Sequence, residues 1–237
     1  MLRCDTPEEL LETLRQLSDK GNPAVILSYC TDNAVEEFAG TFLMTATMFS
    51  SVVPIMAAQT DADPQSTQMM LQIVEIMGHS MKKDTTKEAR DAYQRLSSRT
   101  NVMMAAFRKG PAYDDVDEFE ADLRMSVGML RDPRMFVSEV FSSMQSNSDG
   151  DALLKNLQPD QKTTWKLDYF DEGRMATATP DSVTSEGEHT STLQLSRTEQ
   201  GWRIHKLFDK TTLAKLATGP TASTSTSASA GSTDVAN

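Results

Sequence analysis

The sequence contains few cysteines and no clusters of basic residues. Cys4 and Cys30 are the only cysteines, which is too few for a disulfide framework. Lysine and arginine occur in runs no longer than pairs such as Lys82-Lys83, and the formal net charge is −11. Because binding to nucleic-acid phosphates depends on clustered positive charge, the sequence predicts no nucleic-acid partner.

Signatures of catalysis and of cofactor binding are also missing. The chain has no G-x-S-x-G nucleophile motif and no glycine-rich phosphate loop. Its three histidines, His79, His189 and His205, are far apart and lack the i, i+4 spacing of metal ligands. The loop at 145–150 resembles a calcium loop but lacks the acidic residues required at its first and last ligand positions. We therefore expect no metal and no cofactor, and the sequence favours a protein that is not an enzyme without deciding the matter.

One long segment, residues 38–60, carries no charge. Threonine, serine and Pro54 dilute its apolar content, and acidic residues flank it on both sides, so it shows no positive-inside asymmetry. We predict a buried core helix and no membrane span. The opening Met-Leu-Arg is too short to hold the apolar region of a signal peptide. As written, the chain is expected to be cytoplasmic, and export or lipid anchoring would require a start upstream of Met1.

Helix-start signals mark the first two thirds of the chain. Capping boxes occur at Thr6-Pro7-Glu8-Glu9 and at Thr85-Thr86-Lys87-Glu88. A capping residue followed by proline recurs at Asn22-Pro23, Asp63-Pro64 and Asp132-Pro133. With apolar residues at helical spacing, these signals predict helices over residues 7–20, 23–30, 34–58, 65–82, 86–107, 116–130 and 133–144.

The pattern changes to period-two alternation after Pro159. Segments rich in β-branched and aromatic residues, separated by turns with glycine, predict four antiparallel strands at 165–170, 174–179, 190–197 and 202–208. We therefore expect an α+β fold in which a helix-rich N-terminal two thirds packs on a C-terminal four-stranded antiparallel sheet. The predicted organisation is a single domain over 1–216, with a helical part at 34–157 and the sheet at 163–208. The Ser/Thr/Ala-rich stretch 217–237 is expected to be a disordered tail.

Two clusters have both a structural and a functional interpretation. The start of the helix predicted at 116–130 is crowded with acidic residues, namely Asp114, Asp115, Asp117, Glu118, Glu120 and Asp122. They indicate either a cation site or a docking patch for a basic partner, or, as we favour, charge that stabilises the positive end of a helix dipole. The 15 methionines are interpreted mainly as core residues, and an adaptable partner-binding groove is the alternative.

Both ends of the chain resemble one known family. The run Thr6-Pro7-Glu8-Glu9-Leu10-Leu11 through Lys20-Gly21-Asn22-Pro23 and Val25–Thr31 is similar to the opening helices of the nuclear-transport-factor-two-like superfamily. Asp171–Thr177, Thr192–Arg197 and Gly201-Trp202-Arg203-Ile204 look like its closing strands. This superfamily shares a cone-shaped fold with the ketosteroid isomerases. The resemblance implies a conical sheet that encloses a small apolar ligand or serves as an interaction platform, while the helical stretch 34–157 departs from the family pattern. No catalytic residue carries over.

The candidate ligand-binding residues are Trp165, Tyr169, Trp202 and Ile204. Residues two apart on a strand share a sheet face, so each strand can present its pair to the helices. In a hollow cone these side chains would line a pocket, with the Tyr169 hydroxyl as a polar group, whereas in a filled one they are core. The sequence thus predicts a non-catalytic domain that binds a small apolar ligand or a protein partner. The alternatives are a cone-fold enzyme acting on a small apolar substrate and a helical scaffold protein. Oligomeric state is left open.

Overall fold

A computed structural model describes residues 3–19, 23–57, 64–105, 113–145, 164–180 and 192–218 of the chain. Its helices are α1 (Pro7–Asp19), α2 (Pro23–Ile26), α3 (Asp32–Ala57), α4 (Pro64–Ser80), α5 (Lys87–Ala105), α6 (Val116–Ser126), α7 (Pro133–Gln145) and α9 (Lys210–Thr218). Its strands are β1 (Trp165–Phe170), β2 (Met175–Pro180), β3 (Leu193–Thr198) and β4 (Gly201–Lys206). The predicted α+β class, with helices first and a four-stranded antiparallel sheet last, is confirmed.

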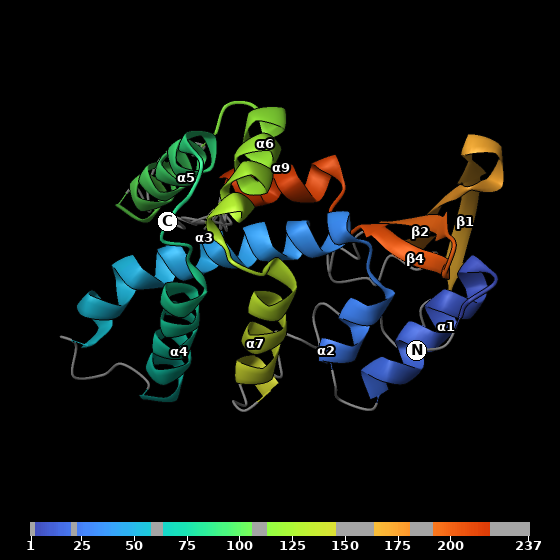
Figure 1. The fold of residues 1–237 in the computed structure, drawn as a ribbon, viewed down its shortest axis with the longest axis horizontal. Coiled ribbons are helices and arrows are strands. Elements are labelled where there is room, and N and C mark those ends of the chain that lie inside the picture. The colour runs from blue at the N-terminus through green and yellow to red at the C-terminus, as the bar shows by residue number, and fades with distance from the viewer. Residues whose placement is uncertain are drawn as a thin grey trace, which may run out of the picture.

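Helix α3 is the centre of the helical part. It contacts α4 and α7 on one side and α5 and α6 on the other (Figure 1). Phe38 and Phe42 meet the ring of Phe141 edge-on, with centroids 5.3 and 5.5 Å apart, and Pro54 is accommodated inside the helix. Over the described part of the chain, no helix combines the length and apolarity needed to cross a membrane.

The described starts of α1, α5 and α7 carry the predicted capping signals. The Thr6 hydroxyl accepts from the Glu9 N–H, and the Asp132 carboxylate accepts from the N–H of Met135. Two details differ. The Glu9 side chain reaches back to the N–H of Asp5 rather than Thr6, and the second box is capped by Thr86, one residue later than predicted. The caps predicted at Asn22 and Asp63 and the calcium-like stretch after Gln145 lie outside the described residues.

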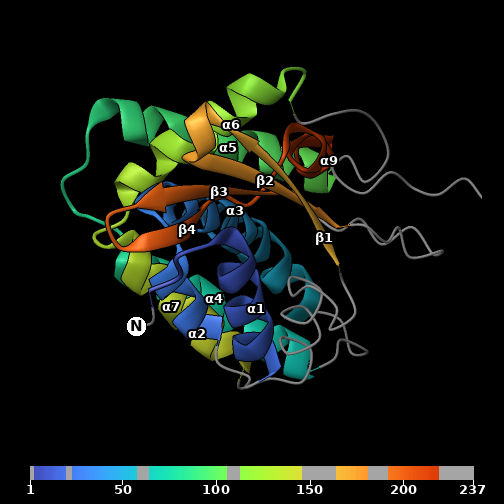
Figure 2. The same ribbon diagram turned by 90° about the vertical axis from the view of Figure 1, so that its right-hand side faces the viewer.

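The sheet is a meander in the order β1-β2-β3-β4, and it lies over α1 (Figure 2). One face carries Leu167, Ala178, Leu195 and Ile204, which join the leucines of α1 in the main core. Since α1 and α3 both supply this core, it runs without interruption from the sheet into the helical part.

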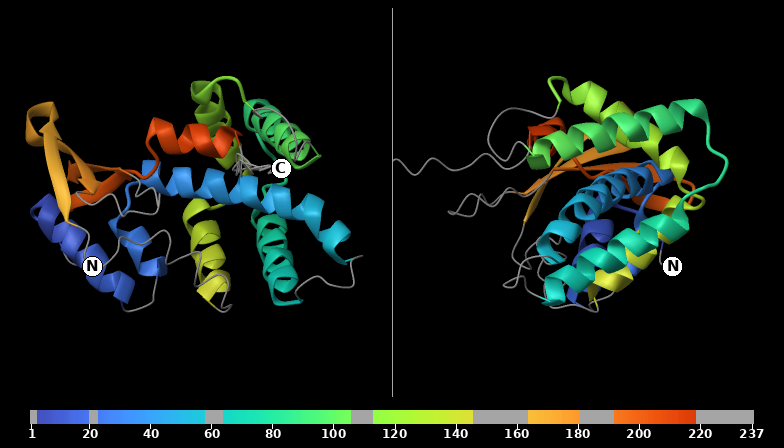
Figure 3. Two further views of the ribbon diagram at one scale, coloured as in Figure 1. Left: turned by 180° about the vertical axis from the view of Figure 1, so that it is seen from behind. Right: turned by 90° about the vertical axis from the view of Figure 1, so that its left-hand side faces the viewer.

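Helix α9 follows the sheet and turns back onto α6 (Figure 3). Its Leu213 and Ala217 are buried in a second apolar cluster with Phe119 and Leu123 of α6. The helix ends at Thr218, so the predicted start of the tail at residue 217 is two residues too early. Residues 219–237, the rest of the predicted tail, lie outside the described residues.

Candidate functional site

The four candidate ligand-binding residues divide between core and surface. Trp202 and Ile204 are 3% and 2% exposed and belong to the main core. Trp165 is partly buried against that core, while Tyr169 is 52% exposed. The face on which they were predicted to line a pocket is thus occupied at β4 by packed side chains, because α1 contributes Leu10 to the same core.

Tyr169 and Trp202 come together although their strands are not neighbours. Their rings meet edge-on with centroids 6.2 Å apart. Tyr169 lies directly opposite Ala176 on β2, whose small side chain leaves room for the two rings to approach. The Tyr169 hydroxyl pairs with a carboxylate oxygen of Glu8 at 3.2 Å. Trp165 lies at the other end of β1, so the predicted set of four does not converge on one point.

The two edges of the sheet differ. Along β4 the N–H of Trp202 donates to the carbonyl of Cys4, and the carbonyl of Ile204 accepts from the N–H of Thr31, each at 2.8 Å. The chain's own N-terminal segments therefore cover that edge. Strand β1 pairs with β2 only, so its outer edge has no strand neighbour among the residues described.

One backbone hydrogen bond fixes which groups point out of the β1 edge. The N–H of Arg197 donates to the carbonyl of Arg174 across the β2–β3 pair at 2.8 Å. Backbone groups of successive residues in an antiparallel strand point to opposite neighbours. Two residues after Arg174, Ala176 therefore also turns its N–H and C=O toward β3, where it faces Leu195.

The same alternation shows in which direction the backbone N–H and C=O groups of each β1 residue point. Since Ala176 points toward β3, its partner Tyr169 turns its backbone groups away from β2. Leu167 and Trp165, two and four residues earlier, do the same. These outward donors and acceptors lie beside two exposed aromatic side chains, Tyr169 and Phe170, the latter 43% exposed. We define the β1 edge as residues 165–170 with these outward groups.

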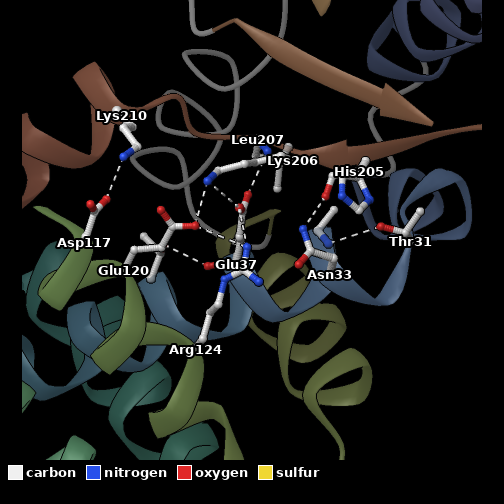
Figure 4. Close-up of polar contacts among 12 residues, drawn as sticks. Thr31, Asn33, Glu37, Asp117, Glu120, Arg124, His205, Lys206, Leu207 and Lys210 are labelled. Atoms are coloured by element: carbon white, nitrogen blue, oxygen red, sulfur yellow. Dashed lines mark hydrogen bonds and ion pairs between the residues drawn. The ribbon is translucent and has the colours of Figure 1, made fainter. Parts of the chain in front are cut away.

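A second feature is the buried carboxyl of Glu37 on α3 (Figure 4). Its Oε2 accepts from the N–H of Leu207, just after β4, at 2.7 Å. Its Oε1 is buried and accepts no hydrogen bond from any residue of the described segments. Nitrogens of Arg124 and Lys206 lie 3.9 and 4.0 Å from Oε1, beyond hydrogen-bonding distance.

Both cations are bound more closely by Glu120 of α6. Its carboxylate lies 2.6 Å from Nζ of Lys206 and 3.2 Å from Nη2 of Arg124. Burial raises the pKa of Glu37, and the opposing effects of the Leu207 amide and of the two cations are smaller. Burial also lowers the pKa of the neighbouring His205, assisted by the charges of Arg124 and Lys206.

This junction joins three elements and leaves Glu37 almost fully enclosed among the described residues. The residue is 6% exposed, and Asn33, one turn earlier on α3, donates to the backbone carbonyl of His205 at 2.7 Å. Sequence reasoning missed Glu37. The signal for it was its place three residues after Ala34 and three before Gly40, both on the buried face of α3.

The acidic cluster pairs with cations of the same chain. Asp115 caps α6 by accepting from the N–H of Asp117, in agreement with the favoured helix-dipole interpretation. The other carboxylates of the helix form pairs that link it to α5, β4 and α9, namely Asp117–Lys210, Glu118–Arg99, Glu120–Lys206 and Asp122–Arg95. The described residues contain no group of three or more acidic, histidine or cysteine side chains arranged to hold a metal ion.

Comparison with known proteins gave no match: no family model, no curated protein and no solved structure matches this chain. The resemblance to the nuclear-transport-factor-two-like superfamily therefore stays a prediction.

Proposed function

We propose that this chain is a non-catalytic protein-interaction domain whose binding surface is the β1 edge. The observation that carries the proposal is the contrast between the two sheet edges. The β4 edge is covered by Cys4 and Thr31, whereas Trp165, Leu167 and Tyr169 turn backbone donors and acceptors outward. An extended segment of another protein can add to such an edge, with main-chain hydrogen bonds supplying affinity and side-chain contacts supplying specificity.

The two alternatives, a small-ligand domain and an enzyme, each need a cavity at a place where the structure has packed side chains. A small-ligand domain, and equally a cone-fold enzyme for a small apolar substrate, would hold its ligand between the sheet and α1. Leu10, Leu14, Trp202 and Ile204 are all buried in one core at that place. The carboxyl of Glu37 lies at the junction of α3, α6 and β4 and is enclosed there. These observations support partner binding over ligand binding.

Replacing Trp202 distinguishes a packed face from a pocket. Since Trp202 is core, Trp202→Ala should lower the free energy of unfolding by ~3–5 kcal/mol in urea denaturation. Tyr169→Ala is the matched control, and because Tyr169 is half exposed it should cost ~1 kcal/mol. The folded wild type should not enhance the fluorescence of anilinonaphthalene sulfonate. Dye binding by the wild type, together with a small loss for Trp202→Ala, would indicate a pocket and contradict the proposal.

A library of random linear peptides tests partner binding at the β1 edge. Leu167→Pro removes one outward N–H and leaves the bonds to β2, because proline is tolerated at an edge position. Leu167→Ala is the control that loses a similar side chain but keeps the N–H. Peptides selected on the wild type should bind Leu167→Ala and should lose at least tenfold in affinity for Leu167→Pro. Equal binding to both variants would place the interaction elsewhere.

A further inference from the structure

We infer that the partner of the β1 edge is a second copy of this chain, which pairs its own β1 antiparallel to the first about a two-fold axis through Leu167. This inference rests on the proposed function and specifies the partner. In such a dimer the two sheets become one continuous sheet, and each copy presents the same surface to the other.

The outward backbone groups restrict the register of this pairing. Only residues that point outward can exchange hydrogen bonds, so Trp165, Leu167 and Tyr169 must pair among themselves. With the axis at Leu167, that residue pairs with its own copy, and Trp165 pairs with Tyr169 of the other copy on both sides. Each of these pairs exchanges two hydrogen bonds, so every outward donor and acceptor of the three residues is satisfied.

The side chains favour this register over its neighbours. With the axis at Leu167, Lys166 of one copy lies opposite Asp168 of the other, twice by symmetry. These are non-hydrogen-bonded pairs, in which opposing side chains are closest. A shift of one register step in either direction would instead place Lys166 opposite its own copy or Asp168 opposite its own copy. Like charges directly opposite each other are destabilising, so charge complementarity selects the central register.

Within the segments that the structure describes, these residues are available to a second copy. Lys166 and Asp168 are exposed and pair only weakly with each other along the strand, at 3.5 Å. Strand β1 lies at one end of the molecule, on the side away from α4 and α5, as the opposite views of Figures 1 and 3 show. The second copy can therefore approach the edge without meeting the helical part formed by α3 to α7.

The size of the contact sets the expected affinity. An edge pairing of one six-residue strand buries less than the ~1,200 Å² that marks the lower limit of stable interfaces. The dimer should therefore be weak, with a dissociation constant of ~10–100 μM, and should form with rising protein concentration. Sedimentation equilibrium of the full chain between ~5 μM and ~500 μM measures this association directly.

Charge variants test the register. Lys166→Asp places Asp opposite Asp, and Asp168→Lys places Lys opposite Lys, so each variant alone should weaken the dimer at least tenfold. Mixing the two variants in equal amounts should restore association, because the mixed dimer regains both opposite-charge pairs. The double variant Lys166→Asp/Asp168→Lys should also dimerise. Lys83→Asp and Glu199→Lys, equal changes of charge at exposed positions elsewhere, should have no effect.

Each other outcome overturns the inference. A wild type that stays monomeric over the whole range shows that a second copy is not the partner. A dimer unaffected by the single variants uses another surface, and failure of the mixture to associate excludes the register. In the first case, peptides that still distinguish Leu167→Pro from Leu167→Ala would leave the proposed function intact with a different partner. If the wild type stays monomeric and peptides also bind Leu167→Pro and Leu167→Ala equally, both the dimer and the proposed function are contradicted.

Discussion

Glu37 is an ionisable residue on the buried face of α3. Because folding raises its pKa above the ordinary 4.5, the folded state holds the proton more tightly than the unfolded chain does. The resulting stabilisation is fully present below pH 4.5 and is lost as the pH rises through the folded pKa. The groups that act on the carboxyl are the backbone amides of Leu207 and Phe208 and the charges of Lys206 and Arg124.

Glu37→Gln should remove this pH dependence. The glutamine oxygen can still accept from Leu207, while the neutral side chain avoids the cost of a buried charge. Relative to wild type, the variant's free energy of unfolding should rise with pH, by ~1.4 kcal/mol for each unit between the unfolded and folded pKa values. Urea denaturation from pH 4 to 8 measures the difference, and Glu36→Gln, at the exposed neighbouring position, is the control. A difference that does not change with pH would contradict the assignment.

Gly201 is required at the turn between β3 and β4. Its φ of +97° is unfavourable for other residues, and an added Cβ would lie 2.4 Å from the carbonyl oxygen of Cys4. We expect Gly201→Ala to lower the free energy of unfolding by more than ~2 kcal/mol in urea denaturation. Gly173→Ala is the control, since Gly173 has φ +78° with open space around it and should cost only ~1 kcal/mol. Equal losses would show that the approach of Cys4 is unimportant.

At the scale of elements, carboxylates of α6 form ion pairs with cations of α5, β4 and α9. Asp122 is 1% exposed and makes a bidentate contact to Arg95 of α5, while the hydroxyl of Tyr113 donates to it at 3.2 Å. Arg99, also on α5, pairs with Glu118 and lies 4.2 Å from the centre of the Tyr113 ring. Helices α5 and α6 are thus joined by two ion pairs, one with a buried carboxylate and one whose carboxylate is 42% exposed.

Removing these two charges should have unequal effects. Asp122→Asn should lower the free energy of unfolding by ~2 kcal/mol, because the charge-assisted hydrogen bonds that a buried carboxylate accepts are weakened. Glu118→Gln removes a pair that water screens and should cost less than ~0.5 kcal/mol. Chemical denaturation of both variants provides the comparison. Similar losses for the two would mean that burial of Asp122 contributes nothing.

Sequence patterns predicted elements better than contacts between elements. The caps at Thr6 and Asp132 depend on neighbouring residues, so local spacing sufficed to predict them. The partners of Glu37 and Asp122 lie 170 and 27 residues away in sequence, so no local pattern pairs them. The alternation of β1 was visible in the sequence, whereas its place at the outer edge of the described sheet followed only from the strand order.

At the scale of the whole molecule, the α+β class followed from composition and periodicity, but whether the sheet face is packed did not. Trp202 and Ile204 show the same alternation in a pocket and in a core, and only the position of α1 distinguishes them. The C-terminal boundary was misplaced for a similar reason. Ala217 belongs by composition to the Ser/Thr/Ala-rich stretch, yet it packs on α6.

Truncation tests this boundary. A chain that ends at Gly219 keeps all of α9 and loses only residues that offer no large apolar side chain except Val235. Its thermal midpoint should lie within ~1 °C of the full chain by circular dichroism. A chain that ends at Asp209 loses α9 with Leu213 and Ala217 and should melt several degrees lower. A fall of several degrees for the Gly219 chain would show that the tail docks.

Because N-terminal segments cover the β4 edge, their contacts with the sheet can form only late in synthesis of the chain. The contacts of Asn33 with His205 and of Glu37 with Leu207 join residues 172 and 170 positions apart. The helical part around Phe38, Phe42 and Phe141 can assemble as soon as α7 has left the ribosome. Helix α1, however, cannot complete its contacts with the sheet until β4 emerges. The first helix made is thus among the last to complete its packing, and until then the leucines that face the sheet stay exposed.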